Sequence, residues 1–428
     1  MASGMLSFDQ VPPLAAPLRF FVTAPLFIAL AGLLAVIDGP AILASRWTPA
    51  ALAATHLLTV GFMLQVMLGA LIQVLPVVAG AALARPLWVA RIVHPAINLG
   101  ALALAGGFLW SAPGWLHAAG TLLALALLVF VVAAGSALFR VPSTSPSIRG
   151  IKLSLAGLAV VGGSGLFMLL ALAGGWSLPL LALADLHAAW GLAGWAGVLL
   201  AAVAYVVVPM FQLTPGYAAR PAWGFPLFLF TVLLAWSAAL AFDAEWPARL
   251  GRLLLAGGGA AFALQTLRLQ AKRRRARPDS TFRYWQFGLY GALLALAMLA
   301  AGALFPALAD DPQWTPAFGL VLLLGAFVPL IVGMLAKIVP FLLWLDLQNH
   351  GLVGKALPPM NKLLPEAPMQ RQFRVFVAAA GLALAAVFLP DWLSRPAGAL
   401  LIAAALWLAV NLTQAAWRHG RQLQQAPA

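Results

Sequence analysis

Residues 61–76 read GFMLQVMLGALIQVLP, and two later stretches repeat their layout. These are residues 194–209, GWAGVLLAAVAYVVVP, and residues 325–340, GAFVPLIVGMLAKIVP. In each copy a proline follows the first glycine by 15 residues, and an aromatic residue stands one or two positions after that glycine. The copies lie 133 and 131 residues apart, and a repeat of nearly fixed period indicates similar structural units. The sequence therefore predicts three similar thirds.

The composition is that of an integral membrane protein. Hydrophobic residues make up 63% of the chain and charged residues only 8%, with a mean hydropathy of +0.97. A soluble domain could not cover its surface with so few charges. The composition thus excludes an ordinary soluble enzyme or binding module.

Hydrophobic runs that could cross a hydrocarbon core of ~30 Å recur along the whole chain. We expect twelve spans, at about 20–39, 50–78, 87–111, 113–139, 150–174, 182–210, 222–242, 247–270, 283–306, 314–345, 372–390 and 394–417. They divide into three pseudo-repeats of four helices, at about 20–139, 150–270 and 283–417. The expected fold is an all-α polytopic membrane protein in which three four-helix units are related by pseudo-threefold symmetry. Prolines 76, 209 and 340 are expected to kink or end the second helix of each unit.

Basic residues indicate the orientation in the membrane. The net charge is +14, and of 25 Lys and Arg residues twenty fall on one side of the predicted spans and four on the other, with Lys337 inside a span. Because cytoplasmic loops are rich in Lys and Arg, both termini are predicted to be cytoplasmic in a bacterial-type inner membrane. Residues 1–428 would form one membrane domain with a cytoplasmic tail at 418–428. The first nineteen residues lack the features of a removable signal peptide.

The expected contacts follow from this topology. The lipid bilayer is the main partner, and the basic run at 272–277 is interpreted as a cytoplasmic loop that also suits anionic lipid head groups. No nucleic-acid partner is expected. The chain has no cysteine, so a redox function would need a cofactor held by other residues.

Ionisable residues inside a membrane are costly and are therefore functional candidates. His56 and His187 are predicted at similar depth in the outer third of the membrane, where imidazole could bind haem iron. The alternative is that each histidine only donates a hydrogen bond to a neighbouring helix. When the repeats are aligned, His187 precedes the position of His56 by two residues, which turns a helix by roughly 200°. If both helices present the same face inward, the two imidazoles would not point the same way, and one of them need not be a ligand.

The other candidates are less central. His117, near the outer end of its span, is an alternative ligand. Lys337 could pair with an acidic residue, extend to the membrane interface or bind a proton or anion. His94 is expected to be structural. His350 and His419 lie outside the predicted spans and are expected to be solvated.

Three short strings resemble a known family. Residues 55–62 (THLLTVGF), 186–195 (LHAAWGLAGW) and 337–344 (KIVPFLLW) resemble H-L-x-x-x-G, H-A-H-x-x-L-x-G-W and K-I-V-P-F-x-x-W strings. These strings occur in orphan, NnrS-like and oxidase-subunit-like branches of the haem–copper oxidase subunit I superfamily. The resemblance extends to twelve spans in three units with cytoplasmic termini.

The resemblance implies a haem-binding role with an incomplete active site. In catalytic members, a span 2 histidine and one span 10 histidine hold a low-spin haem, another span 10 histidine holds the active-site haem, and spans 6 and 7 hold copper. His56 matches the first ligand, and His187 falls near the copper-binding helix. Spans 7 and 10 here contain no histidine, Ala189 stands at the second histidine of the span 6 string, and Asp346 occupies another expected histidine position. Copper and oxygen reduction are therefore not expected.

The leading hypothesis is a haem b protein for electron transfer, sensing, or a nitric-oxide or respiratory stress response, using His56 with His187 or His117. Partner membrane subunits or a redox partner would fit this role. Two alternatives stay open. One is a cofactor-free transporter in which Lys337 lines a path for a small or anionic solute, and the other is an accessory or assembly subunit.

Overall fold

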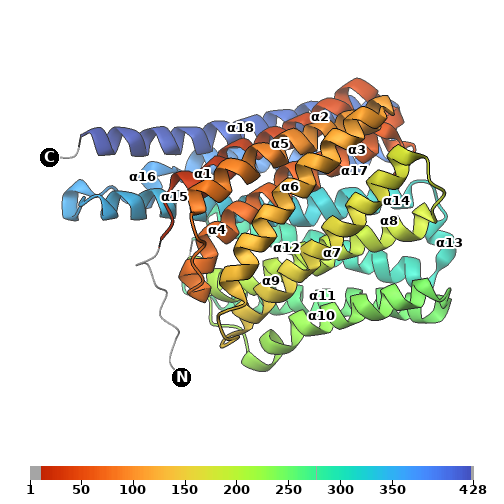
Figure 1. Cartoon of the computed structure of the whole chain (residues 1–428). Coiled ribbons are helices and arrows are strands. Elements are labelled where there is room, and N and C mark those ends of the chain that lie inside the picture. The colour runs from red at the N-terminus through yellow and green to blue at the C-terminus, as the bar shows by residue number, and fades with distance from the viewer. Residues whose placement is uncertain (1–10, 276, 426–428) are drawn as a thin grey trace.

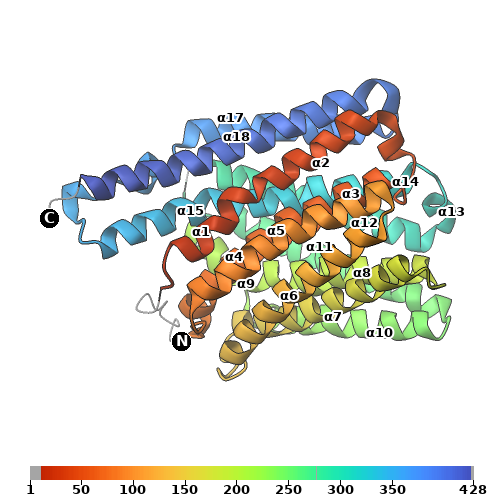
Figure 2. The same cartoon turned by 45° about the horizontal axis from the view of Figure 1, so that its top comes forward.

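The computed structural model describes residues 11–275 and 277–425, and this part of the chain contains helices and no strand. The axes of most helices are roughly aligned, and the helices form one elongated bundle (Figures 1 and 2). The expected all-α fold is confirmed. In Figure 1, α1 begins and α18 ends at the same end of the bundle.

The helices follow the predicted order closely. The first third contains α1 (Ala15–Thr23), α2 (Pro25–Asp38), η1 (Gly39–Leu43), α3 (Pro49–His56), η2 (Leu57–Leu64), α4 (Gln65–Ala79), α5 (Pro86–Trp110) and α6 (Pro113–Leu138). The second third contains α7 (Pro146–Gly174), α8 (Leu180–Ala189), η3 (Trp190–Gly197), α9 (Val198–Gln212), α10 (Ala219–Ala241) and α11 (Glu245–Ala271). The last third contains α12 (Ser280–Leu304), α13 (Pro306–Ala309), α14 (Trp314–Leu320), η4 (Val321–Phe327), α15 (Val328–Asn349), η5 (Gly354–Ala356), α16 (Met360–Leu363), α17 (Glu366–Ala386) and α18 (Pro390–Gln424).

Within the described residues, eleven helical segments are long and apolar enough to cross a membrane. They confirm a polytopic membrane protein whose helices contact lipid. The predicted span at 372–390 corresponds to α17, which is not among the eleven because its first turns carry Glu366, Arg371 and Arg374. These charges shorten its apolar stretch, so the total of twelve spans stays a prediction.

The second helix of each third contains a π-helical segment at the same place. The π-helices η2, η3 and η4 each begin four residues before the first glycine of the repeat, which is Gly61, Gly194 or Gly325. A π-helix inside an α-helix is uncommon and often marks a functional site. We call the continuous segments α3–η2–α4, α8–η3–α9 and α14–η4–α15 the inner helices.

Each inner helix also makes equivalent close contacts with the preceding long helix. At the first glycine of the repeat, a Cβ added to Gly157 of α7 would lie 2.4 Å from the Gly194 carbonyl oxygen. One added to Gly291 of α12 would lie 2.0 Å from the Gly325 carbonyl oxygen. Phe27 of α2 fills the corresponding position against Gly61.

A second contact lies seven residues before Phe27, Gly157 and Gly291. There, a residue of the preceding segment contacts the small residue that comes next in the repeat. The pairs are Phe20 with Gly69, Gly150 with Ala202, and Tyr284 with Gly333. Small residues allow two helices to approach closely in a membrane, where packing replaces the hydrophobic driving force. The repeated sequence thus produces the same helix–helix contact three times.

The repeat prolines lie inside the inner helices. Pro76 and Pro209 stand three residues before the ends of α4 and α9, whereas α15 continues nine residues beyond Pro340 to Asn349. Pro340 therefore does not end its helix, and kinking at the three prolines stays a prediction. Neighbouring groups in a tightly packed membrane bundle can compensate for the hydrogen bond that proline removes.

The expected solvation of His419 is also wrong. The last helix, α18, continues to Gln424, so the predicted tail is helical up to that residue, while positions 426–428 lie outside the described residues. His419 is buried, and its Nε2 lies 2.8 Å from Asp346 Oδ2 on α15. Arg418 donates to the Leu363 carbonyl, which holds the helix against the connection beside it. His350 is exposed, as expected.

Candidate functional site

His56 and His187 lie next to each other. His56 is the last residue of α3, His187 lies near the end of α8, and both side chains are half-buried. Their ring centres are 6.4 Å apart, and the ring planes differ by 24°. Phe108 of α5 packs on His56 with its ring centre 5.1 Å away. Among the sequence candidates, these two histidines are brought together.

The difference in register does not separate the two imidazoles. Whether the rings point the same way stays a prediction. Two neighbouring helices in a cyclic arrangement meet through different faces even when each turns the same face toward the axis, as subunits do in a ring. A register difference of two residues, or roughly 200° of rotation, is compatible with this kind of contact.

Hydrogen bonds define the protonation of both rings. His56 Nδ1 is 2.8 Å from the Leu52 carbonyl oxygen, which can only accept, so Nδ1 carries the proton. The Ser164 hydroxyl donates its hydrogen to the Val161 carbonyl, and so it must accept at 3.2 Å from His187 Nδ1. In its neutral form each ring therefore leaves its Nε2 as a lone-pair donor. Orientation of a ligand histidine through its other nitrogen is typical of metal sites.

The separation of the two stacked rings can be compared with that of two imidazoles bound to one metal. Imidazole nitrogens bind metals at about 2.0–2.1 Å, so two rings on opposite sides of one metal have centres about 6.3 Å apart. The observed 6.4 Å is close to that separation. No group of three or more His, Asp or Glu side chains in the described residues could hold a metal ion. Two imidazoles suffice as axial ligands of haem, because the porphyrin supplies the other four nitrogens.

Helix α8, which carries His187, is less buried than the rest of its inner helix. No residue of α8 is buried, although η3 and α9 of the same inner helix contain many buried residues. Gly165 of α7 lies under the ring, since an added Cβ would be 2.8 Å from His187 Cε1. Helix α7 thus contacts His187 through Ser164 and Gly165, and the residues of α8 are exposed or half-buried.

An ion pair fixes α8 against the segment that leads into α3. Arg46 Nη1 lies 2.6 Å from Asp185 Oδ1, and both side chains are about 40% exposed, at 39% and 42%. Asp185 was missed as a candidate by sequence reasoning, although it is an acidic residue inside a predicted span and two positions from His187. Such an exposed pair contributes only about 0–1 kcal/mol to stability. We therefore infer that its role is to position α8.

Two other histidines take no part in this pair. His117 is exposed on α6, and the Thr121 hydroxyl donates to its backbone carbonyl. His94 lies 2.9 Å from the Thr23 hydroxyl through Nε2 and packs edge-on against Phe20. The structural role expected for His94 agrees with these contacts.

Lys337 is part of an ion-pair cluster at the start of α12. Its Nζ lies 2.8 Å from Asp279 Oδ2, which Arg275 Nη1 also approaches at 2.8 Å. The other carboxylate oxygen caps α12 by accepting from the Phe282 backbone N–H. Lys337 is therefore paired, and the cluster connects α15 to α12.

The cluster predicts a pH-dependent stability. Burial favours a higher pKa for Asp279, but the Lys337 hydrogen bond and charge, the Phe282 N–H and Arg275 outweigh it and hold this pKa below its usual value. A carboxylate with a lowered pKa stabilises the fold above its unfolded pKa of about 3.9, and that stability is lost as pH falls through the folded pKa. We expect Asp279→Asn to cost about 3 kcal/mol at pH 7 and progressively less below pH ~4.

Thermal unfolding of purified protein in detergent from pH 7 to pH 3 measures this effect. Asp310→Asn is the control, because Asp310 is exposed on the connection after α12. Equal stability of wild type and Asp279→Asn at pH 7 would contradict the role given to the cluster.

Comparison of the chain with protein-family models finds no match, and comparison with curated proteins finds none either. The resemblance to the oxidase superfamily therefore stays a prediction from the residues of this chain alone.

Proposed function

We propose that this membrane protein binds one haem b between His56 and His187 and transfers electrons. The observation that carries the proposal is the pair of adjacent imidazoles, each with Nδ1 bonded to an oxygen, which leaves Nε2 of the neutral ring as a lone-pair donor. When bound, haem would supply a one-electron iron couple at this position. The Leu52 carbonyl and Ser164 hydroxyl would hold the two rings in their orientation.

The ligand set favours electron transfer over gas sensing or oxygen reduction. Gas binding needs an open coordination position, and a second histidine from the protein would occupy it. The family resemblance suggested a span 10 partner for His56, but the ring beside His56 belongs to α8. We therefore propose an oxidase-like scaffold with a single haem site of its own, and no copper centre.

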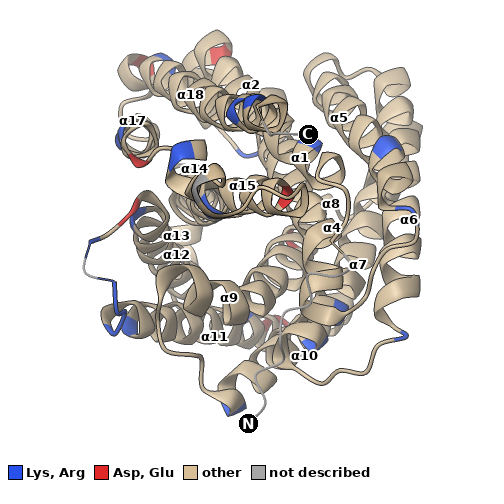
Figure 3. Ribbon diagram, turned by 90° about the vertical axis from the view of Figure 1, so that its left-hand side faces the viewer, with Lys and Arg blue, Asp and Glu red and all other residues tan. Residues whose placement is uncertain are grey.

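The proposal includes twelve spans in three units and cytoplasmic termini in a bacterial-type inner membrane. The chain begins α1 and ends α18 at the same end of the bundle, which supports an even number of spans with α17 as the twelfth (Figure 1). Figure 3 looks at the bundle from that end and shows Lys and Arg in the connections around it. The excess of basic residues supports a cytoplasmic location for this end. A partner that delivers or accepts electrons would complete the function.

A difference spectrum tests the proposal. Protein expressed with ample haem and purified in mild detergent should show a Soret band, with sharp reduced-minus-oxidised bands of haem b. Carbon monoxide added to the reduced protein should leave the spectrum unchanged, because both axial positions are taken. A protein without a Soret band would exclude haem binding, and a full spectral shift with carbon monoxide would exclude the two-histidine site.

A further inference from the structure

A cavity of about 70 Å³, partly open to its surroundings, lies between the three inner helices, away from the histidine pair. Fourteen residues of its lining come from α4, α9 and α15, and one comes from α12. Counted from the first glycine of each repeat, positions 5, 6, 9 and 10 line it in all three copies. They are Val66, Met67, Ala70 and Leu71; Leu199, Leu200, Val203 and Ala204; and Leu330, Ile331, Met334 and Leu335.

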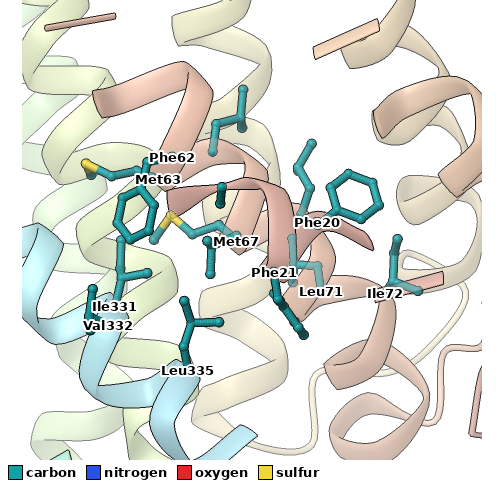
Figure 4. Packing of buried hydrophobic residues seen from close by; sticks show 14 of the residues in the cluster. Phe20, Phe21, Phe62, Met63, Met67, Leu71, Ile72, Ile331, Val332 and Leu335 are labelled. Atoms are coloured by element: carbon teal, nitrogen blue, oxygen red, sulfur yellow. The ribbon is translucent and has the colours of Figure 1, made fainter. Parts of the chain in front are cut away.

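This threefold lining places the cavity on the pseudo-threefold axis of the bundle. Positions 5, 6, 9 and 10 lie on one face of a helix, since residues four apart are neighbours on its surface. The same face of each inner helix therefore points to the axis. Figure 4 shows part of the wall, where Met67 of α4 lies toward Ile331 and Leu335 of α15. We call this space the axial cavity.

The lining suits an apolar occupant. The residues from the inner helices are alanine, valine, leucine, isoleucine and methionine, and the remaining residue is Trp285. The Trp285 indole is 1% exposed, and its Nε1 has no hydrogen-bond partner in the described part of the chain. A buried water usually makes two to four hydrogen bonds, and Trp285 offers at most one. Water is therefore a poor occupant.

The volume of the axial cavity limits the size of the ligand that it can hold. A single water needs about 10–15 Å³ of cavity, whereas an engineered apolar cavity of about 150 Å³ binds benzene or xenon. We propose that the axial cavity binds small apolar molecules of the size of a diatomic gas or a xenon atom. Dispersion contacts with three helices hold the molecule, since an empty cavity loses such contacts on every side. This inference is independent of the haem proposal.

Xenon is the probe for the axial cavity. Crystals of the full-length protein under xenon pressure should give an anomalous peak between α4, α9 and α15, beside Trp285. Ala70→Leu places extra methyl groups in the cavity and should abolish that peak. Ala403→Leu is the matched control, because Ala403 is exposed on α18, and its crystals should keep the peak. Val203→Phe is a second filling variant if Ala70→Leu does not fold.

Each outcome of the xenon experiment either supports or overturns the proposal. A xenon peak on the axis that is lost in a folded filling variant and kept in Ala403→Leu supports the proposal. Wild-type crystals that bind xenon elsewhere but not on the axis would overturn it. So would an ordered water chain through the cavity, or an unchanged axial peak in the filling variants.

Discussion

His187→Ala should lose its haem, with the Soret absorbance per protein falling to background, and His56→Ala should do the same. Each variant removes one of two Nε2 donors that lie on separate helices, with ring centres 6.4 Å apart. One remaining imidazole cannot replace both axial ligands, and α8 has no buried residue to retain the group by packing alone. Haem content is measured as pyridine haemochrome per mole of protein.

Two further variants sharpen this test. His117→Ala should keep full haem content, because His117 is an exposed histidine on α6 outside the pair. Ser164→Ala removes the acceptor that orients His187 Nδ1, and loss of such an orienting group costs about 10–100-fold in metal affinity. Full haem in His187→Ala, or equal loss in His117→Ala, would contradict the assignment of ligands.

Gly157→Ala should destabilise the bundle by about 3 kcal/mol or more, near the upper end of overpacking effects. Its new Cβ would lie 2.4 Å from the Gly194 carbonyl oxygen and 2.7 Å from the Gly194 carbonyl carbon, both backbone atoms that cannot rotate away. Helix α7 would have to separate from η3, which carries the first glycine of the second repeat. The measurement is the thermal unfolding midpoint in a single detergent.

Gly163→Ala is the control on the same helix. An added Cβ at Gly163 meets nothing within 4 Å, so this change should leave stability unchanged or raise it by about 0.5–1 kcal/mol. If both variants unfold at the wild-type temperature, the close contact at Gly157 does not hold α7 to the second inner helix.

The helices could be predicted from the sequence because hydropathy in membrane proteins is a strong constraint. The expected span 50–78 corresponds to α3, η2 and α4 at Pro49–Ala79, and 314–345 corresponds to Trp314–Asn349. The boundary of α18 was less predictable. Its polar end, with Arg418 and His419, continues as helix beyond the apolar stretch, because contacts with α15 and Leu363 stabilise it there.

How the helices pack against one another could not be predicted from hydropathy. Glycine and proline spacing indicated three similar units, but it gave no π-helices and did not show which face of each helix meets its neighbour. The spacing therefore could not show that the rings of His56 and His187 lie close together. The face that lines the axial cavity was readable in principle, since the same four positions after each glycine are apolar in all copies.

The residues that contact the two histidines or their helices could not be predicted from the sequence, for a related reason. Ser164, Phe108 and Asp185 are ordinary residues in their own helices, and only tertiary packing places them beside the two histidines. Sequence reasoning selects residues by type, and it finds a histidine in a membrane more readily than the hydroxyl that orients it.

The structure of the haem-loaded protein, determined by electron cryo-microscopy, tests the central claim most directly. The account predicts planar density between α3 and α8, with iron bound by His56 Nε2 and His187 Nε2. It also predicts that Nδ1 of each ring keeps its bond to the Leu52 carbonyl or the Ser164 hydroxyl. Two histidine rings in direct contact with no density between them, in protein expressed with ample haem, would contradict it.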